Sequence, residues 1–242
     1  MKRSFIVLSV FLSACSALET RPVKVTSVYP PGSIRPDAPV TRDQAGAKAE
    51  PVSAPAYKAG QQWAYRRVDL WRKEETERFR QELAFEEAGR WMVRWTILNS
   101  DDPVRRGSIT GELLDPASQS FADSRMSGRN EPLRFPLSPG KSWSFEYGFQ
   151  SQPGRQIRVT QTATVKGWET VSVPAGSFRA LRVEHAGRYT ANDWGYVWSG
   201  TIREVYWYAP SARRVVMREY KDTKGDGGTW DQWRDELVEL RL

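Results

Sequence analysis

The 242-residue sequence has one cysteine and one histidine, and this scarcity excludes several familiar kinds of site. A single cysteine cannot form a disulfide within the chain. One histidine and one cysteine cannot supply the ligands of the usual zinc or haem centres. The sequence also has no glycine-rich phosphate loop and no Gly-x-Ser-x-Gly nucleophile motif. We therefore expect no metal, no cofactor and no catalytic residue, and we interpret the protein as a non-enzyme.

Long hydrophobic runs and a large charge of one sign are also missing. Hydrophobic residues make up 39% of the chain, which excludes a protein with many membrane-spanning helices. Residues 57–242 carry 29 basic and 25 acidic residues, a formal net charge of +4. This mixed balance does not provide the basic surface that nucleic acids require, although it allows a weak affinity for anionic lipid. No nucleic-acid partner is expected.

The sequence begins with an export signal. Lys2 and Arg3 precede an apolar run at residues 5–12, which is shorter than the roughly 20 residues that cross a membrane. The run ends in Leu-Ser-Ala-Cys, which resembles the lipobox of bacterial lipoproteins, and its last position holds the chain's only cysteine, Cys15. The alternative is a secretory signal with an incidental cysteine.

The lipobox resemblance implies that residues 1–14 are removed and that Cys15 is acylated, with palmitate among the fatty acids. Several acyl chains anchor a protein stably to a bilayer without a spanning helix. In Gram-negative sorting, a residue other than Asp after the cysteine permits release to the outer membrane, and Ser16 occupies that position. We therefore expect a lipid-anchored protein of the cell outer membrane that faces the periplasm.

Residues 15–56 and residues 57–242 differ sharply in composition. The first segment holds the cysteine, seven of the fifteen prolines and none of the eleven tryptophans. It cannot bury enough apolar area to offset chain entropy, so we expect a disordered tether between the lipid and the domain. Residues 57–242 contain every tryptophan and are long enough for one folded domain.

Apolar and polar residues alternate with a period of two through residues 57–242, as in half-buried β-strands. The clearest example is 143–149, where four aromatic residues share one face. The segment 72–87 also has a helix-favouring composition, and we interpret it as a strand. Strands are predicted near residues 61–71, 72–87, 91–97, 105–114, 143–149, 157–165, 177–189, 201–209, 214–221 and 229–240. Turn-forming residues between them favour an all-β domain with an antiparallel sheet.

A short internal repeat predicts two similar halves. The sequence GQQWAY at 60–65 parallels GKSWSF at 140–145, and both segments open a strand with Gly-x-x-Trp-x-aromatic. Two such sets of hairpins would form one strongly curved antiparallel sheet, a half-barrel or incomplete barrel with aromatic faces turned inward.

The eleven tryptophans have two explanations. The alternation places Trp63, Trp91, Trp95 and Trp143 on apolar faces, which indicates a role in the core. Five others lie among polar or charged neighbours, where indole rings could stack on glycan rings or line an acyl-chain groove. These candidate ligand-binding residues are Trp194, Trp198, Trp207, Trp230 and Trp233. For these five, too, packing in the core outweighs ligand binding.

Two further motifs favour structural roles. His185 shares a strand face with Leu181 and Val183, which predicts a packed histidine. The segment 222–227 resembles a calcium loop, but Lys224 stands at its third position, where a hard cation requires an oxygen ligand. We interpret this segment as a hairpin turn.

Carboxylates leave one enzymatic alternative. A glycosidase needs two convergent carboxylates and neither histidine nor cysteine. The 29 acidic residues offer pairs such as Asp115 with Asp123 or Glu184 with Glu204. No spacing selects a pair, so a periplasmic glycan hydrolase is the least favoured function.

Four segments resemble an uncharacterised family of Gram-negative envelope proteins labelled TapB-like, over roughly residues 57–240. They are FPLSPGKSW at 135–143, VSVPAGSFRALRVE at 171–184, EVYWYAP at 204–210 and VVMREY at 215–220. The resemblance implies a curved antiparallel sheet and a periplasmic setting. It implies no activity, substrate or catalytic residue.

Two non-enzymatic functions follow from these features. The favoured hypothesis is an outer-membrane lipoprotein whose periplasmic β domain binds an envelope ligand, lipid-like or glycan, or a protein partner through the concave side of its sheet. The alternative is a purely structural or assembly protein of the envelope with a fully packed core.

Overall fold

The computed structural model describes residues 50–88, 90–99, 108–115, 118–121, 125–152 and 155–242. Within these residues the chain forms β-strands and one short 3-10 helix, η1 (Pro210–Ala212), so the expected all-β class is confirmed. The predicted signal peptide, Cys15 and residues 16–49 of the predicted tether lie outside the described residues.

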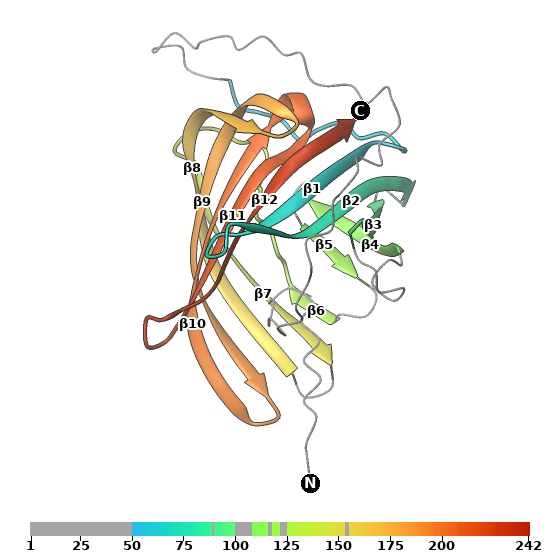
Figure 1. Cartoon of the computed structure of the whole chain (residues 1–242). Coiled ribbons are helices and arrows are strands. Elements are labelled where there is room, and N and C mark those ends of the chain that lie inside the picture. Colours follow the sequence, from blue (N-terminus) through green and yellow to red (C-terminus); the bar gives the residue numbers. More distant parts are fainter. Residues whose placement is uncertain (1–49, 89, 100–107, 116–117, 122–124, 153–154) are drawn as a thin grey trace.

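The described strands form one antiparallel sheet that bends around a common interior (Figure 1). They are β1 (Gln62–Asp69), β2 (Glu74–Glu87), β3 (Arg90–Ile97), β4 (Ser108–Asp115), β5 (Ser118–Phe121), β6 (Arg125–Gly128), β7 (Ser142–Gln152), β8 (Arg155–Val173), β9 (Gly176–Asp193), β10 (Tyr196–Ala209), β11 (Arg214–Lys224) and β12 (Thr229–Arg241). Their order is β5-β4-β3-β2-β1-β12-β11-β10-β9-β8-β7-β6. The strongly curved sheet predicted from the sequence is therefore confirmed.

The strand order follows the chain in two runs joined by the first and last strands. Except for β5 and β6, strands adjacent in sequence pair with each other, and β1 pairs with β12. This leaves β5 and β6 at opposite edges, although Phe121 and Arg125 are only four residues apart and hence within about 14 Å. The edges must curl towards each other. No ladder joins them within the described residues, so the barrel is incomplete.

Alternation along β8 shows how the sequence defines the inner face. Ile157, Val159, Gln161, Ala163 and Val165 are buried, whereas the residues between them are exposed or partly exposed. Two leucines from the segment between β6 and β7 pack against the same face, next to Ala163 and Val165. The inner face is therefore covered by a connecting segment as well as by the curvature of the sheet.

One end of the sheet is covered on both faces. All four residues of β10 from Tyr206 to Ala209 are buried, although successive side chains of a strand point to opposite faces. Tyr206 belongs to one core cluster and Trp207 to another. The β8–β9 hairpin covers the Trp207 side and reaches β12, where the Ala175 amide donates to the Leu237 carbonyl at 3.0 Å.

The internal repeat is present in the structure. Gly60 and Gly140 both have φ of +85°, a conformation that side chains with a Cβ rarely adopt. The Gly60 amide donates to the Leu83 carbonyl at 2.8 Å, and the Gly140 amide donates to the Val165 carbonyl at the same distance. Gly60 before β1 and Gly140 before β7 thus start their strands in the same way.

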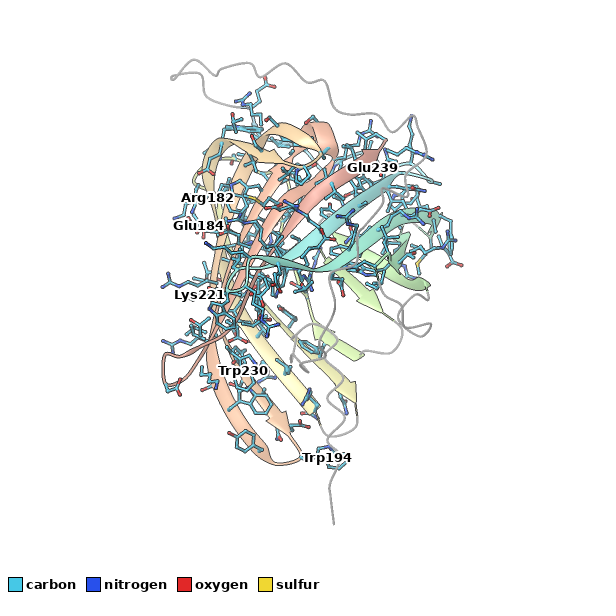
Figure 2. All side chains as sticks on the ribbon, viewed as in Figure 1. Arg182, Glu184, Trp194, Lys221, Trp230 and Glu239 are labelled. Atoms are coloured by element: carbon cyan, nitrogen blue, oxygen red, sulfur yellow. The ribbon has the colours of Figure 1, made fainter. Side chains whose placement is uncertain are left out.

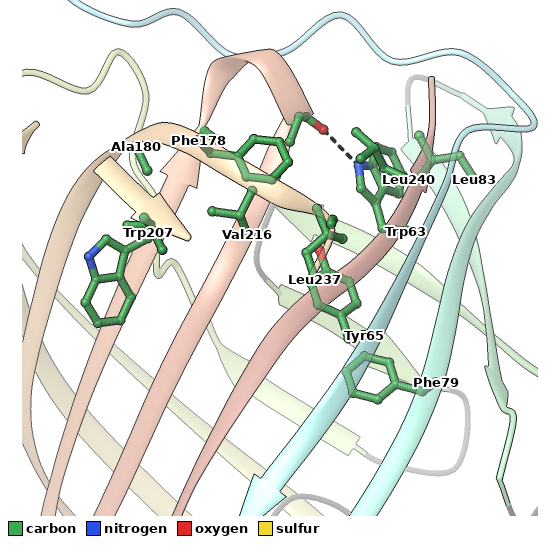
Figure 3. Packing of buried hydrophobic residues seen from close by; sticks show 14 of the residues in the cluster. Trp63, Tyr65, Phe79, Leu83, Phe178, Ala180, Trp207, Val216, Leu237 and Leu240 are labelled. Carbon is green, nitrogen blue, oxygen red and sulfur yellow. Dashed lines mark hydrogen bonds between the residues drawn. The ribbon is translucent and has the colours of Figure 1, made fainter. Parts of the chain in front are cut away.

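The tryptophans of the two repeats also make equivalent bonds. Trp63 Nε1 donates to the Ala212 carbonyl at 2.8 Å, and Trp143 Nε1 donates to the Glu131 carbonyl at 2.8 Å. Figure 3 shows the first of these bonds beside Leu240. In both halves a buried indole fixes a connecting segment to the sheet, since its polar N–H needs a partner once it leaves water.

Most strand predictions are confirmed, including the ambiguous segment that forms β2. The sequence did not predict β5 and β6, which have four residues each, and it placed the start of β10 five residues too late. Domain contacts also begin before residue 57, because Val52 and Leu137 exchange two backbone hydrogen bonds of 2.7 and 2.8 Å.

Candidate functional site

A buried ion pair joins β10 to β11 on the inner face. The Arg218 guanidinium donates to Glu204 Oε1 through Nε at 3.1 Å and through a second nitrogen. Tyr206 donates to the same oxygen at 3.0 Å, and Gln161 donates to Oε2 at 2.8 Å. Burial alone would raise the pKa of Glu204, but Arg218 and the Gln161 hydrogen bond hold it below its ordinary value. Glu204 is thus a charged carboxylate with both oxygens partnered.

A second ion pair continues this row from β12 to β1. Arg67 donates to Asp235 through two nitrogens, at 2.8 and 3.0 Å. The Trp233 ring centroid lies 3.9 Å from the Arg67 guanidinium carbon and 4.8 Å from that of Arg218, and Tyr220 stacks on the ring at 4.9 Å. The inner polar row consists of Gln161, Glu204, Arg218, Asp235 and Arg67. Its members provide hydrogen-bond and charge partners within the chain, as a structural network must in a region of low dielectric.

Asp222 and Asp231 form a different kind of pair nearby. They lie directly opposite each other on β11 and β12. Asp222 Oδ1 and Asp231 Oδ2 are buried and have no hydrogen-bond partner among the described residues. Burial raises the pKa of each to about 6, although hydrogen bonds from Tyr189 and Tyr220 oppose the shift at Asp222. The pair therefore holds a proton under mildly acidic conditions.

We expect Asp222→Asn to stabilise the fold at neutral pH. The folded-state pKa of about 6 exceeds the ordinary 3.8, so the contribution of Asp222 to stability is full below about pH 4 and is lost as the pH rises through about 6. Asparagine removes that loss. By thermal circular dichroism, Tm should rise by about 3 °C near pH 7.5 and by less near pH 4.5. Glu86→Gln, at an exposed carboxylate, is the control; a gain independent of pH would contradict this account.

His185 is a packed histidine, as predicted. It is buried beside Tyr206, with ring centroids 4.7 Å apart, and it meets Phe145 edge-on at 5.8 Å. Burial lowers its pKa to about 4, so the imidazole is neutral at physiological pH. The ring packs among aromatic side chains, and the Glu204 carboxylate nearby is already paired with Arg218.

Exposed aromatic side chains gather at the β9–β10 hairpin. Trp194 is 79% exposed, Tyr196 72% and Val197 59%. Figure 2 shows Trp194 at the far end of this hairpin. Tyr196 contacts the half-buried ring of Trp198, with centroids 5.5 Å apart. We name Trp194, Tyr196, Val197 and Trp198 the aromatic tip.

The turn at this hairpin displays its side chains outward. Trp194 has φ of +53° and Gly195 has φ of +91°. The Gly195 amide donates to Asn192 Oδ1 at 2.9 Å. Positive φ at both central residues is what a two-residue hairpin turn of type I′ requires, and Lys73, Ala88 and Arg213 also have positive φ.

The other three candidate tryptophans have different surroundings. Trp230 is 45% exposed near the β11–β12 turn, and Lys224 Nζ lies 4.4 Å from its ring centroid. Trp207 is buried beneath the β8–β9 hairpin and donates to Glu169 at 2.8 Å, and Trp233 is buried beside the inner polar row. Solvent can therefore reach Trp194, Trp198 and Trp230. Sequence reasoning missed Tyr196 and Val197, whose position directly after Trp194-Gly195 was the available signal.

The carboxylate pairs considered for a glycosidase are not brought together where the structure describes them. Glu204 lies opposite His185, so the neighbouring Glu184 points to the other face of the sheet. The pair of Asp115 and Asp123 lies outside the described side chains. The expected turn at 225–228 is a hairpin turn, in which the Gly228 amide donates to Asp226 Oδ1 at 2.9 Å.

The described residues contain neither a metal-binding cluster nor a membrane-spanning helix. The part of the chain that the structure describes has no group of three or more His, Cys, Asp or Glu side chains able to hold a metal ion. Nor does any helix in that part have the length and apolar character needed to cross a membrane.

Comparison with known proteins shows which solved structures share this architecture. No family model and no curated protein matches the sequence. A crystal structure from Bacteroides fragilis, described provisionally as an exported protein with a YmcC-like fold, superposes with a TM-score of 0.52 at 17% identity, over 79% of this chain and all of that one.

Two further structures are more distant. One is provisionally described as a lipoprotein of Parabacteroides distasonis, with a TM-score of 0.49 and 12% identity over 80% of this chain and all of that one. The other is the hypothetical lipoprotein YmcC of Escherichia coli, with a TM-score of 0.40 and 12% identity over 76% of this chain and 85% of that one. At these identities the likeness to the Bacteroides fragilis protein concerns architecture alone, and the domain of this chain has a YmcC-like fold.

Proposed function

We propose that the protein is a non-enzymatic lipoprotein of the Gram-negative outer membrane whose β domain, in the periplasm, binds an envelope ligand through the aromatic tip. The observation that carries the proposal is the exposure of Trp194, Tyr196 and Val197 on one hairpin. Large exposed apolar groups that lie together mark interaction sites in soluble domains. The ligand class is hydrophobic or amphipathic.

The envelope setting is supported by the N-terminal sequence. The lipobox places Cys15 at the point of acylation, and Ser16 favours the outer membrane. The YmcC-like fold is compatible with this setting, because the solved protein that shares it is described as exported. The resemblance to the TapB-like envelope family belongs to the same proposal.

The inner face is the less favoured place for the ligand. Glu204 is paired with Arg218 there and Asp235 with Arg67, and Trp207 and Trp233 are buried. These packed groups are also the observation that favours the second candidate, a structural or assembly protein of the envelope. The two candidates differ at the aromatic tip, because ligand binding requires its cluster of exposed apolar side chains and a purely structural role does not.

The anchor is tested by Cys15→Ser. Removal of the acylated thiol should move the protein from the membrane pellet to the soluble periplasmic fraction, or leave the signal peptide uncut, because no acyl chain then holds it. Fractionation with immunodetection measures this. Ser16→Ala leaves the lipobox cysteine in place and serves as the control. Unchanged membrane fractionation of a Cys15→Ser protein whose signal peptide has been removed would contradict the anchor.

Ligand binding is tested by native mass spectrometry of the Cys15→Ser chain purified from the periplasm. We expect a one-to-one adduct with the mass of a lipid or glycan, because the aromatic tip offers apolar area for it. The Trp194→Ser/Trp198→Ser protein should lose the adduct, and Trp71→Ser, at another hairpin where Trp71 is 52% exposed, should keep it. An adduct retained by the tip variant would place the ligand elsewhere.

A further inference from the structure

Three cations stand close together on the outer face of β9, β10 and β11. Arg203 on β10 lies directly opposite Lys221 on β11. Arg188 on β9 lies opposite Thr201, two residues before Arg203 and on the same face. All three side chains are exposed. We name Arg188, Arg203 and Lys221 the basic patch; Figure 2 shows Lys221 projecting from the sheet.

The basic patch lacks the ion pairs found elsewhere on the sheet. Other outer-face cations have carboxylate partners, for example Arg66 with Glu236 at 2.7 Å and Arg234 with Glu219 at 2.5 Å. Within the described part of the chain, no carboxylate lies at ion-pair distance from a member of the patch. Like charges directly opposite on neighbouring strands are destabilising. An anionic partner outside the chain would relieve this repulsion.

The basic patch lies on the outer face of β10, and at the aromatic tip this face carries Val197, whereas Tyr196 and Trp198 alternate onto the inner face. On β10, Val197, Ser199, Thr201 and Arg203 alternate with inward-facing residues, so they share the outer face. Along this face the side chains change from apolar to hydroxyl to cationic over about 20 Å. This order suits a hairpin that lies obliquely on a bilayer, with its apolar end in the interface and its cations over the anionic headgroups.

We propose that this surface docks on a bilayer containing anionic phospholipids, with Trp194, Tyr196 and Val197 at the interface and the basic patch facing the headgroup phosphates. The inference rests on the proposed lipoprotein function and names its ligand. A protruding turn suits a deformable lipid surface better than a rigid partner, which would need a matching cavity.

The length of chain before the domain also supports a bilayer as the docking partner. Residues 16–49 separate the predicted lipid anchor from the described domain and can span up to about 110 Å. The 19 residues of β8 span about 60 Å, so the chain is long enough for anchor and tip to engage one bilayer. Attachment through the anchor raises the effective concentration of the tip at that bilayer, so weak docking suffices.

Vesicle flotation of the Cys15→Ser chain tests the proposal without the lipid anchor. The probes are phosphatidylcholine vesicles with and without about 30 mol% phosphatidylglycerol. We expect the chain to float with the anionic vesicles and to bind them about tenfold more tightly than neutral ones. Salt at about 0.5 M should remove most of this preference.

Two surface variants separate the contributions of the basic patch and the aromatic tip to vesicle binding. Arg188→Gln/Arg203→Gln/Lys221→Gln should lose the preference for anionic vesicles, and Trp194→Ser/Tyr196→Ser should weaken binding to them about tenfold. The matched control is Trp71→Ser/Arg72→Gln, which changes an exposed tryptophan and an exposed arginine at the β1–β2 turn. It should bind like the parent chain.

Several outcomes would overturn the inference. The first is failure of the parent chain to float with anionic vesicles, and the second is an equal loss of vesicle binding in the control variant. The third is that the chain binds lipopolysaccharide micelles or a protein but does not bind vesicles. A mass-spectrometric adduct without vesicle binding would remove the docking inference and leave the proposed function standing. Unchanged Tm of the variants would verify that they fold.

Discussion

The pairing of β1 with β12 is the constraint on which the rest of the structure depends. It joins Gln62 to Arg241 across almost the whole domain and turns two runs of hairpins into one sheet. Closing so long a loop costs entropy, which the ladder alone does not offset. The contacts that accompany it do more: Tyr65 lies opposite Leu237 in the core, and Arg67 forms two hydrogen bonds with Asp235. Curvature then brings β5 and β6 towards each other.

The inner polar row is a consequence of that curvature. A curved sheet places the inward side chains of five strands in one enclosed space, where an unpartnered charge would be costly. Glu204 and Arg218 meet this demand by pairing with each other and with Gln161 and Tyr206. At Asp222 and Asp231, where burial raises the pKa to about 6, the cost is instead removed as the pH falls and a carboxyl group is protonated. The two arrangements respond to acid in opposite ways. Protonation of Glu204 would weaken its ion pair with Arg218, whereas protonation of Asp222 or Asp231 removes the cost of burying a charge.

Alternation predicted the strands because each strand has one buried face, a property local to the sequence. It could not predict β5 and β6, since four residues give too few alternations. Packing was favoured over ligand binding for Trp207, but the sequence could not show what covers its ring, because the β8–β9 hairpin that does so is remote in sequence. Asp222 and Asp231 are equidistant from the turn at Asp226 and Gly227, so hairpin register could have paired them; their burial could not be foreseen. Cys15 lies outside the described residues and stays a prediction.

The inner face of the sheet stabilises the fold, and the proposed docking to a bilayer takes place at the exposed β9–β10 hairpin. The most direct measurement is photocrosslinking in living cells with p-benzoylphenylalanine in place of Tyr196, followed by mass spectrometry of the purified protein. The account predicts a phospholipid attached at that position and none when the same group replaces Trp71. Attachment to a protein, or equal lipid attachment at both positions, would contradict it.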